Sequence, residues 1–205
     1  MQAPRNPHLD AMRRTLRYVR ATLDYALFYV ADAEIDLFGY TDADWAGSVT
    51  DHRSTSRFMF SFGSAAVAWS SKKKPTVALS STEAEYRGAA VAACEVAWLY
   101  KLLGDFGLQV NRKVVIYCDN LNNIQLAHNP VFHARTKHIE VHYHFIRERV
   151  LSGDIDLMYV NTEEQVADIF TKALGAEKLQ RFRAMLGVQE LELSSKGSVE
   201  MSSSK

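Results

Sequence analysis

The sequence predicts an α/β fold in which helices flank a five-stranded mixed sheet. Two apolar segments on either side of Gly63-Ser64 have the pattern of a β-hairpin. A nearly all-apolar stretch then follows Ser80 and predicts a long buried helix. Beyond it, strand and helix patterns alternate along the chain. A hairpin followed by this alternation is typical of one compact domain with a mixed sheet.

Five segments have the composition of strands. The first is an apolar run that leads into Asp42 and ends at the turn residues Ala46-Gly47. The fourth is rich in β-branched residues, which predicts a strand buried on both faces. The fifth alternates apolar and polar residues, as strands do. The expected strands are residues 35–43, 58–62, 65–69, 114–118 and 155–160.

Six segments have helical patterns. The second begins after serine and threonine caps near Ser80, with acids in the first turn where the helix dipole favours them. The first has a basic face that either meets a phosphate backbone or is solvated. We expect its apolar residues to pack inward: Leu9, Met12, Leu16, Val19 and Leu23. The expected helices are residues 8–29, 80–103, 120–128, 141–152, 163–174 and 177–186.

Composition indicates a globular protein that stays inside the cell. The chain has 205 residues, of which 47% are hydrophobic, so that a substantial core can form. Its apolar runs do not reach the roughly 18 residues of a membrane span, and the N-terminus lacks a signal-peptide core. We therefore expect an intracellular protein, cytoplasmic or nuclear, that is not secreted. Cys94 and Cys118 are expected to be buried free thiols.

The chain is expected to have three parts and no net charge. Residues 1–34 form an N-terminal helical segment, residues 35–187 the main domain, and residues 188–205 a disordered serine-rich tail. The 24 Lys and Arg residues balance 24 Asp and Glu residues. A neutral chain has no bulk electrostatic attraction to nucleic acid, so any such contact needs a local basic patch.

Two carboxylates, Asp42 and Asp44, stand at the end of the first strand. Side chains alternate along a strand, so these two should project to the same face. Neighbouring carboxylates repel each other unless one is protonated, one is solvated, or a cation lies between them. A solvated strand end would explain the pair by itself, and further acids are needed to indicate a site.

Four further candidate acids occur downstream, at three places in the chain. Glu83 and Glu85 point about 200° apart on their helix, and Glu85 shares its face with small residues that let a sheet approach. If one of the two is buried against the sheet, it should be Glu85. Asp119 follows a buried strand, where it either faces a ligand or caps the next helix. Asp168 lies in the first turns of a helix, where the dipole alone could explain it.

Taken together, four of these acids can converge above one edge of the sheet. They are Asp42, Glu85, Asp119 and Asp168. Carboxylates gathered in this way bind hard cations such as Mg²⁺ or Mn²⁺. Two such ions about 4 Å apart promote hydrolysis of a phosphodiester.

Five motifs occur in order along the chain. They read Tyr-Thr-Asp-Ala-Asp-Trp-Ala-Gly, Ser-Ser-Thr-Glu-Ala-Glu-Tyr, Tyr-Cys-Asp-Asn, Arg-Thr-Lys-His-Ile-Glu-Val-His-Tyr-His-Phe-Ile-Arg-Glu and Gln-Val-Ala-Asp-Ile-Phe-Thr-Lys. Together, over about residues 37–174, they closely resemble the ribonuclease H domain of copia-type LTR retrotransposon polyproteins. Residues 7–29 also resemble the piece that joins reverse transcriptase to ribonuclease H. Residues 1–34 would then be connection-like, and residues 35–187 a ribonuclease H-like domain.

The resemblance implies endonucleolytic hydrolysis of the RNA strand of RNA–DNA hybrids with two Mg²⁺ or Mn²⁺ ions. By resemblance, Asp42 would bridge both ions and Asp168 would complete the site of the ion that activates water. Glu85 and Asp119 would hold the ion at the leaving oxygen. Asp44 would be an outer or solvated neighbour. The alternatives are a catalytically silent nucleic-acid-binding remnant and a structural part of a polymerase assembly.

The expected partners are an RNA–DNA hybrid and a reverse transcriptase domain, with no membrane and no small-molecule cofactor. The candidate nucleic-acid contacts, whose lysines could instead be merely solvated, are Trp45, Lys72, Lys73, Lys74, Arg135, Lys137 and His138. Lys72 to Lys74 are expected in an exposed loop. The sequence departs from the family's pattern at two places. No histidine precedes Asp168 within residues 161–167, and Arg57 stands where relatives usually have a glycine.

Overall fold

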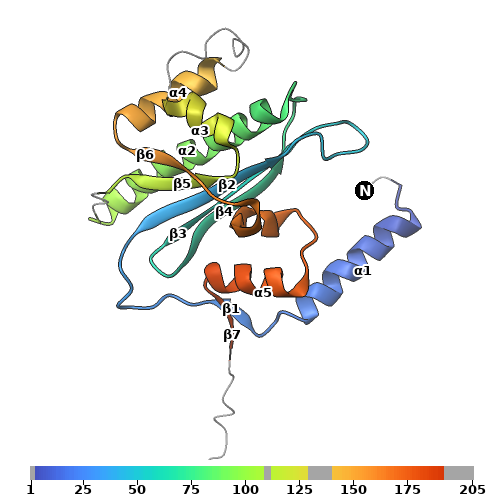
Figure 1. The fold of residues 1–205 in the computed structure, drawn as a ribbon. Helices are drawn as coiled ribbons and strands as arrows, with labels where there is room; N and C mark the ends of the chain where they lie inside the picture. Colours follow the sequence, from blue (N-terminus) through green and yellow to red (C-terminus); the bar gives the residue numbers. More distant parts are fainter. Residues whose placement is uncertain (1–2, 109–111, 129–139, 192–205) are drawn as a thin grey trace, which may run out of the picture.

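A five-stranded mixed sheet forms the centre of the protein (Figure 1). The computed structural model describes residues 3–108, 112–128 and 140–191. The strands are β2 (Leu37–Asp44), β3 (Thr55–Phe62), β4 (Ala65–Lys73), β5 (Val114–Cys118) and β6 (Ile155–Tyr159), in the order β4-β3-β2-β5-β6. The pairs β4-β3 and β3-β2 are antiparallel, whereas β2-β5 and β5-β6 are parallel. The predicted α/β class, with a five-stranded mixed sheet flanked by helices, is confirmed.

Helices cover both faces of this sheet. One face carries α2 (Ser81–Asp105), α3 (Leu121–His128) and α4 (Glu140–Leu151); the other carries the short 3-10 helices η3 (Thr162–Glu164) and η4 (Val166–Phe170), with α5 (Ala176–Met185) (Figure 1). Two hydrophobic clusters follow from the alternation of strand side chains. Leu37 and Phe60 pack with the first group of helices, and Met59 packs with the second.

The long helix α2 lies close to the end of β2. Ser80 caps it, because its Oγ accepts a hydrogen bond from the Glu83 N–H at 3.1 Å. Gly88 faces the sheet, and a Cβ at this position would lie 3.6 Å from the carbonyl oxygen of Asp42. The small residues on this face therefore allow the helix to approach the strand, as the sequence predicts, and they place Glu85 beside Asp42.

The N-terminal segment differs from its prediction. Helix α1 (Asn6–Arg20) ends well before residue 29, and strand β1 (Tyr25–Leu27) follows. This strand pairs antiparallel with β7 (Val188–Glu190), which lies in the segment expected to be a disordered tail. The prediction of a helix at residues 25–27 and the prediction of disorder at residues 188–190 are therefore both wrong. Two three-residue strands give no periodic signal, and each depends on a partner from the opposite end of the chain.

The apolar face of α1 is exposed instead of packed inward. No residue of α1, all of which the structure describes, is buried. The expected inward residues are exposed by 42–69%: Leu9, Met12, Leu16, Val19 and Leu23. Figure 1 shows α1 projecting from the body of the protein beyond α5. The pattern correctly indicates an amphipathic helix, but a pattern cannot say whether its apolar face has a partner within the same chain.

Three smaller expectations also need correction. Residues 163–174 do not form one helix, because the side chains of Asn161 and Gln165 cap two successive short turns, η3 and η4. Lys72 and Lys73 belong to the end of β4 and not to a loop. Cys118 is buried, but Cys94 is exposed on α2.

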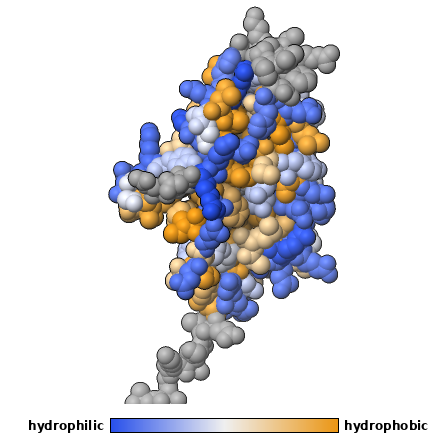
Figure 2. All heavy atoms as spheres, turned by 60° about the vertical axis from the view of Figure 1, so that its left-hand side comes forward, coloured by the Kyte–Doolittle hydropathy of each residue, from blue (hydrophilic) through white to orange (hydrophobic). Residues whose placement is uncertain are grey.

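No helix among the described residues has the length and apolar character needed to cross a membrane. On the face drawn in Figure 2, hydrophobic side chains are interspersed with hydrophilic ones.

Candidate active site

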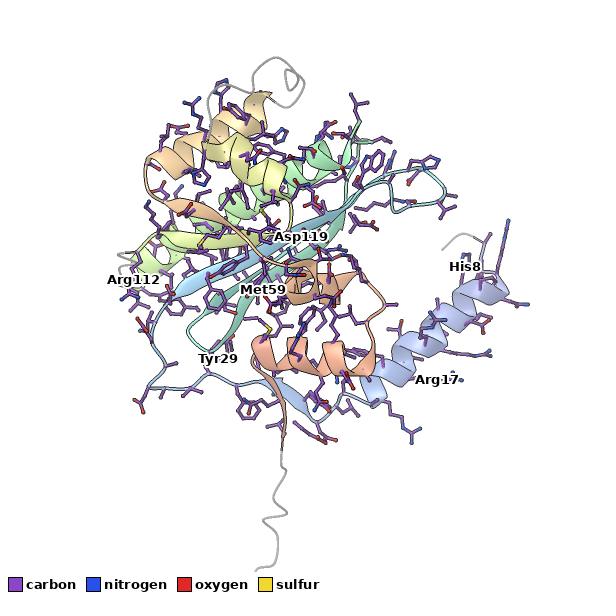
Figure 3. All side chains as sticks on the ribbon, viewed as in Figure 1. His8, Arg17, Tyr29, Met59, Arg112 and Asp119 are labelled. Atoms are coloured by element: carbon purple, nitrogen blue, oxygen red, sulfur yellow. The ribbon has the colours of Figure 1, made fainter. Side chains whose placement is uncertain are left out.

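Three of the four predicted acids meet at one edge of the sheet. The parallel strands β2 and β5 end side by side, so Asp42 at the end of β2 lies close to Asp119, which follows β5. Glu85 reaches the same point from the first turns of α2. One carboxylate oxygen from each of the three lies within 4.8 Å of the other two. Figure 3 shows Asp119 near the centre of the molecule, between the sheet and the short helices.

Glu85 is a buried acid with a perturbed pKa. Its Oε2 accepts a hydrogen bond from the Ala43 N–H at 3.1 Å, which fixes the carboxylate at the end of β2. Burial, together with the negative charge of Asp119, raises the pKa of Glu85 to about 8. A carboxyl group in this position takes up either a proton or a cation at neutral pH.

Glu83 is buried as well, contrary to the expectation that Glu85 alone would be. Its Oε2 accepts a hydrogen bond from the Leu79 N–H at 2.7 Å, and its Oε1 pairs with Arg87 at 2.6 Å. These contacts compensate the carboxylate at the start of α2. The two acids therefore differ in their surroundings rather than in their burial.

Asp119 does not cap the helix that follows it. The Asn120 Oδ1 takes that role and accepts hydrogen bonds from the N–H groups of Asn122 and Asn123 at 3.0 and 3.3 Å. The Oδ2 of Asp119 instead accepts a hydrogen bond from Thr162 Oγ1 at 3.0 Å. These contacts therefore exclude the alternative that Asp119 caps the helix, and they hold its carboxylate at the acidic cluster.

Asp168 lies on the other side of Asp42 and outside the close group of three. Its short helix η4 is fastened to β2 by Gln165, whose Nε2 donates to the Thr41 carbonyl at 3.0 Å. Asp168 is buried, and its Oδ1 pairs with Arg57 Nη2 at 3.2 Å and with Lys172 Nζ at 2.7 Å. A helix dipole is therefore not what compensates this carboxylate.

Arg57 lies at the centre of the site, which the sequence analysis did not predict. It is directly opposite Asp42 in the antiparallel β2-β3 register, and its Nη2 contacts Asp42 Oδ2 as well as Asp168. The side chain is 1% exposed, and burial lowers the pKa of Arg57 while the charges of Asp168, Glu85 and Asp119 raise it. The β2-β3 register places Arg57 beside Asp42, and the sequence alone does not reveal that register.

The two halves of the acidic site differ in their fit to a metal ion. Asp42, Glu85 and Asp119 offer three oxygen ligands from carboxylates, which suits a hard divalent cation such as Mg²⁺ or Mn²⁺. Between Asp42 and Asp168 the guanidinium of Arg57 already lies against both carboxylates. With Arg57 in this position, that half does not fit a second ion.

The described nucleic-acid candidates gather near the same end of the sheet. Trp45 is 47% exposed, and its Nε1 donates to the Ala78 carbonyl at 3.0 Å. Lys72 and Lys73 are exposed at the end of β4, two strands from the end of β2. Lys73 pairs with Asp51 at 2.9 Å, and burial lowers the pKa of the half-buried Lys74. Arg135, Lys137 and His138 lie outside the described residues.

Several known proteins are similar in sequence to almost the whole of this chain. No protein-family model matches the chain. The Retrovirus-related Pol polyprotein from transposon RE1 of Arabidopsis thaliana is 43% identical over 188 residues, covering 92% of this chain and 13% of that protein. The corresponding polyprotein from transposon TNT 1-94 of Nicotiana tabacum is 38% identical over 188 residues, covering 92% of this chain and 14% of that protein.

Among solved structures, the crystal structure of LC11-RNase H1 in complex with RNA/DNA hybrid is similar at a TM-score of 0.49 and 11% identity, covering 63% of this chain and 88% of that one. The chain spans less than a sixth of the length of the two polyproteins. Within that span the identity extends over almost the whole chain. Almost the whole chain is therefore homologous to one segment of retrovirus-related Pol polyproteins from transposons.

Proposed function

We propose that this chain hydrolyses the RNA strand of RNA–DNA hybrids with the help of divalent cations. The observation that carries the proposal is the meeting of Asp42, Glu85 and Asp119, whose carboxylate oxygens lie within 4.8 Å of one another. Three carboxylates in one largely buried place repel one another strongly unless a cation compensates them. The relationship to transposon polyproteins supports a nucleic acid as the substrate.

The positions of the acidic residues support the roles proposed for them. When bound, Mg²⁺ or Mn²⁺ would activate water and stabilise the leaving oxygen of the phosphodiester. Asp42, Glu85 and Asp119 would hold an ion, whereas Asp168 pairs with Arg57 and is not assigned to a second one. The Ala43 N–H and Thr162 hydroxyl orient Glu85 and Asp119, so that these carboxylates do not have to reorganise when a cation binds.

The hybrid would lie across the end of the sheet that carries these acids. Trp45 would stack against a sugar or base, and Lys72 and Lys73 would contact phosphates; the exposure of all three supports this proposal. Arg135, Lys137 and His138 are proposed as further contacts on the basis of sequence. Recognition of a hybrid rests on shape and on the 2′-hydroxyls of the RNA strand and not on base sequence.

A reverse transcriptase domain is the proposed protein partner. Residues 1–34 would connect it to the ribonuclease H-like domain, with the main domain at residues 35–187. The exposed apolar face of α1 supports this proposal, because an amphipathic helix gains stability when its apolar face is covered. Figure 3 shows His8 and Arg17 of α1 well away from Asp119, so this contact would leave the acidic site open.

The test is cleavage of an RNA–DNA hybrid in which each strand carries its own label. We expect cuts in the RNA strand that require Mg²⁺ or Mn²⁺, and we expect Asp119→Asn and Asp42→Asn to remove them. Asp119→Asn is the cleaner variant, because its carboxylate does not contact Arg57 and its Thr162 hydrogen bond can be kept by the amide oxygen. Cleavage by Asp119→Asn at the unmodified rate would refute the assignment.

A catalytically silent hybrid-binding protein is the second candidate function. One specific observation favours it: Arg57 contacts both Asp42 and Asp168, where one of the two expected ions would lie. Under this alternative the unmodified chain binds the labelled hybrid in the assay above but leaves both strands intact.

A further inference from the structure

We propose that Arg57 is a built-in cation that takes the place of a divalent ion between Asp42 and Asp168. The chain would then hold one ion, at Asp42, Glu85 and Asp119, and cleave hybrids more slowly than the same chain without the Arg57 side chain. This inference rests on the proposed function, and it adds a residue that sets the number of ions and the rate.

The first support is the position of Arg57 in the sheet. Asp42 and Arg57 are direct partners across the β2-β3 pair, and Ser71 of β4 lies on the far side of Arg57. The backbone of Arg57 is therefore held between two neighbouring strands. Strand alternation sends its side chain to the same face as Asp42, which is also the face covered by η4 and Asp168.

The second support is the distribution of charge around the acids. Asp42 and Asp168 carry two negative charges, and Arg57 and Lys172 supply two positive ones: Lys172 Nζ lies 2.7 Å from Asp168 and 4.0 Å from Asp42. In contrast, no Lys or Arg within the described part of the chain forms an ion pair with Glu85 or Asp119. A divalent ion is therefore attracted to the Glu85 side and has little electrostatic gain on the Asp168 side.

The third support is the incomplete hydrogen bonding of the Arg57 guanidinium. Arg57 is 1% exposed, yet its Nε and Nη1 find no hydrogen-bond partner among the described residues. An arginine keeps its charge even when buried, because its pKa is far above neutral. Its two carboxylate contacts are therefore what compensates the buried charge, and an ion between Asp42 and Asp168 would have to displace Arg57 from them.

A double-mutant cycle separates one-ion from two-ion binding without measuring activity. The four chains are the unmodified one, Arg57→Ala, Asp168→Asn and the double variant, and the readout is the affinity for Mn²⁺ from the paramagnetic signal of the free ion. Because Asp168 pairs with Arg57 and not with an ion in the unmodified chain, Asp168→Asn should change its Mn²⁺ affinity by less than about twofold. In the Arg57→Ala background the same change should weaken binding roughly tenfold.

Equal effects of Asp168→Asn in both backgrounds would overturn the inference. Arg53→Ala is the matched control: this arginine lies just before β3, is exposed and pairs with Asp51, and its loss should leave Mn²⁺ affinity unchanged. If Arg57→Ala fails to fold, the single variant Asp168→Asn still tests the inference. A much weaker Mn²⁺ affinity of Asp168→Asn than of the unmodified chain would contradict a site occupied by Arg57.

Hybrid cleavage distinguishes failure of this inference from failure of the proposed function. If Arg57 restrains the site, Arg57→Ala should cleave roughly tenfold faster than the unmodified chain at the same Mn²⁺ concentration. Coupled Mn²⁺ binding without cleavage by any chain would support the inference and refute the nuclease. Equal metal-dependent cleavage by both chains, with no coupling, would support the nuclease and refute the inference.

Discussion

At the scale of single residues, the site is defined by how each buried charge is compensated. Glu83 has Arg87 and a backbone N–H, and Asp168 has Arg57 and Lys172. Glu85 has one backbone N–H and no described ion pair, so burial raises its pKa to about 8. On α2, uncompensated charge and not burial by itself distinguishes Glu85, a candidate ion ligand, from Glu83, a structural acid.

The pKa of Glu85 predicts how stability changes with pH when divalent ions are removed by a chelator. Because the folded-state pKa is raised from 4.5 to about 8, the folded chain holds a proton that the unfolded chain releases, and stability falls as pH rises through this window. Glu85→Gln removes this loss while keeping a carbonyl oxygen for the Ala43 N–H. On going from pH 5 to pH 9, the unfolding free energy of Glu85→Gln should rise by on the order of 3 kcal/mol relative to that of the unmodified chain.

Urea denaturation at both pH values measures this gain. Glu148→Gln on the exposed side of α4 is the control and should follow the unmodified chain. Parallel stability curves for Glu85→Gln and the unmodified chain would show that Glu85 does not titrate in this range.

At the scale of elements, the sequence predicts those that carry a strong local signal. The hairpin around Gly63-Ser64, the long helix α2 and the β-branched strand β5 all appear where they are expected. Strands β1 and β7 do not, because they are short and form only as a pair across the length of the chain. The same limit applies to the site: Asp42 can be chosen from its strand end, but the place of Arg57 depends on a register between strands.

The close approach of α2 to β2 predicts a size limit at Gly88. An alanine there would place its Cβ at ordinary contact distance, 3.6 Å from the Cβ of Ala43 and the carbonyl of Asp42. A valine adds two methyl groups and should push the helix away, at a cost of about 1–3 kcal/mol in unfolding free energy. Gly104 in the same helix has nothing within 4 Å of such a Cβ, so Gly104→Val is the matched control and should cost far less.

Urea denaturation compares the four variants Gly88→Ala, Gly88→Val, Gly104→Ala and Gly104→Val. The predicted order has Gly88→Val as the least stable by a clear margin. Equal stability of the two valine variants would contradict tight packing of α2 against the sheet.

At the scale of the whole molecule, the chain matches a short segment of much longer relatives, and the apolar face of α1 is uncovered. It covers 13% of the RE1 polyprotein and 14% of the TNT 1-94 polyprotein. The apolar face of α1 is exposed, whereas the main sheet is covered by helices on both faces (Figure 1). The sequence predicts that α1 is amphipathic, but the partner of its apolar face cannot be read from the helix pattern.

The exposed face of α1 predicts separate effects on stability and on association. Leu16 is 60% exposed, so Leu16→Asp should change the unfolding free energy of the chain by less than about 0.5 kcal/mol. If this face meets a reverse transcriptase domain, the same change should weaken binding to such a domain by roughly tenfold or more, because it places a charge in an apolar contact.

Calorimetry with a purified reverse transcriptase domain measures the association. Thr15→Asp, a neighbouring position of α1, is the control for the added charge. Equal binding by Leu16→Asp and the unmodified chain would exclude this face as the contact.

The most direct measurement is metal-dependent cleavage of a doubly labelled RNA–DNA hybrid by Arg57→Ala, with Arg57→Ala/Asp119→Asn as its control. The proposed site predicts cuts confined to the RNA strand, faster than those of the unmodified chain, dependent on Mg²⁺ or Mn²⁺, and lost in the double variant. A folded Arg57→Ala chain that binds the hybrid and Mn²⁺ but cuts neither strand would contradict the assignment of this acidic cluster as a nuclease site.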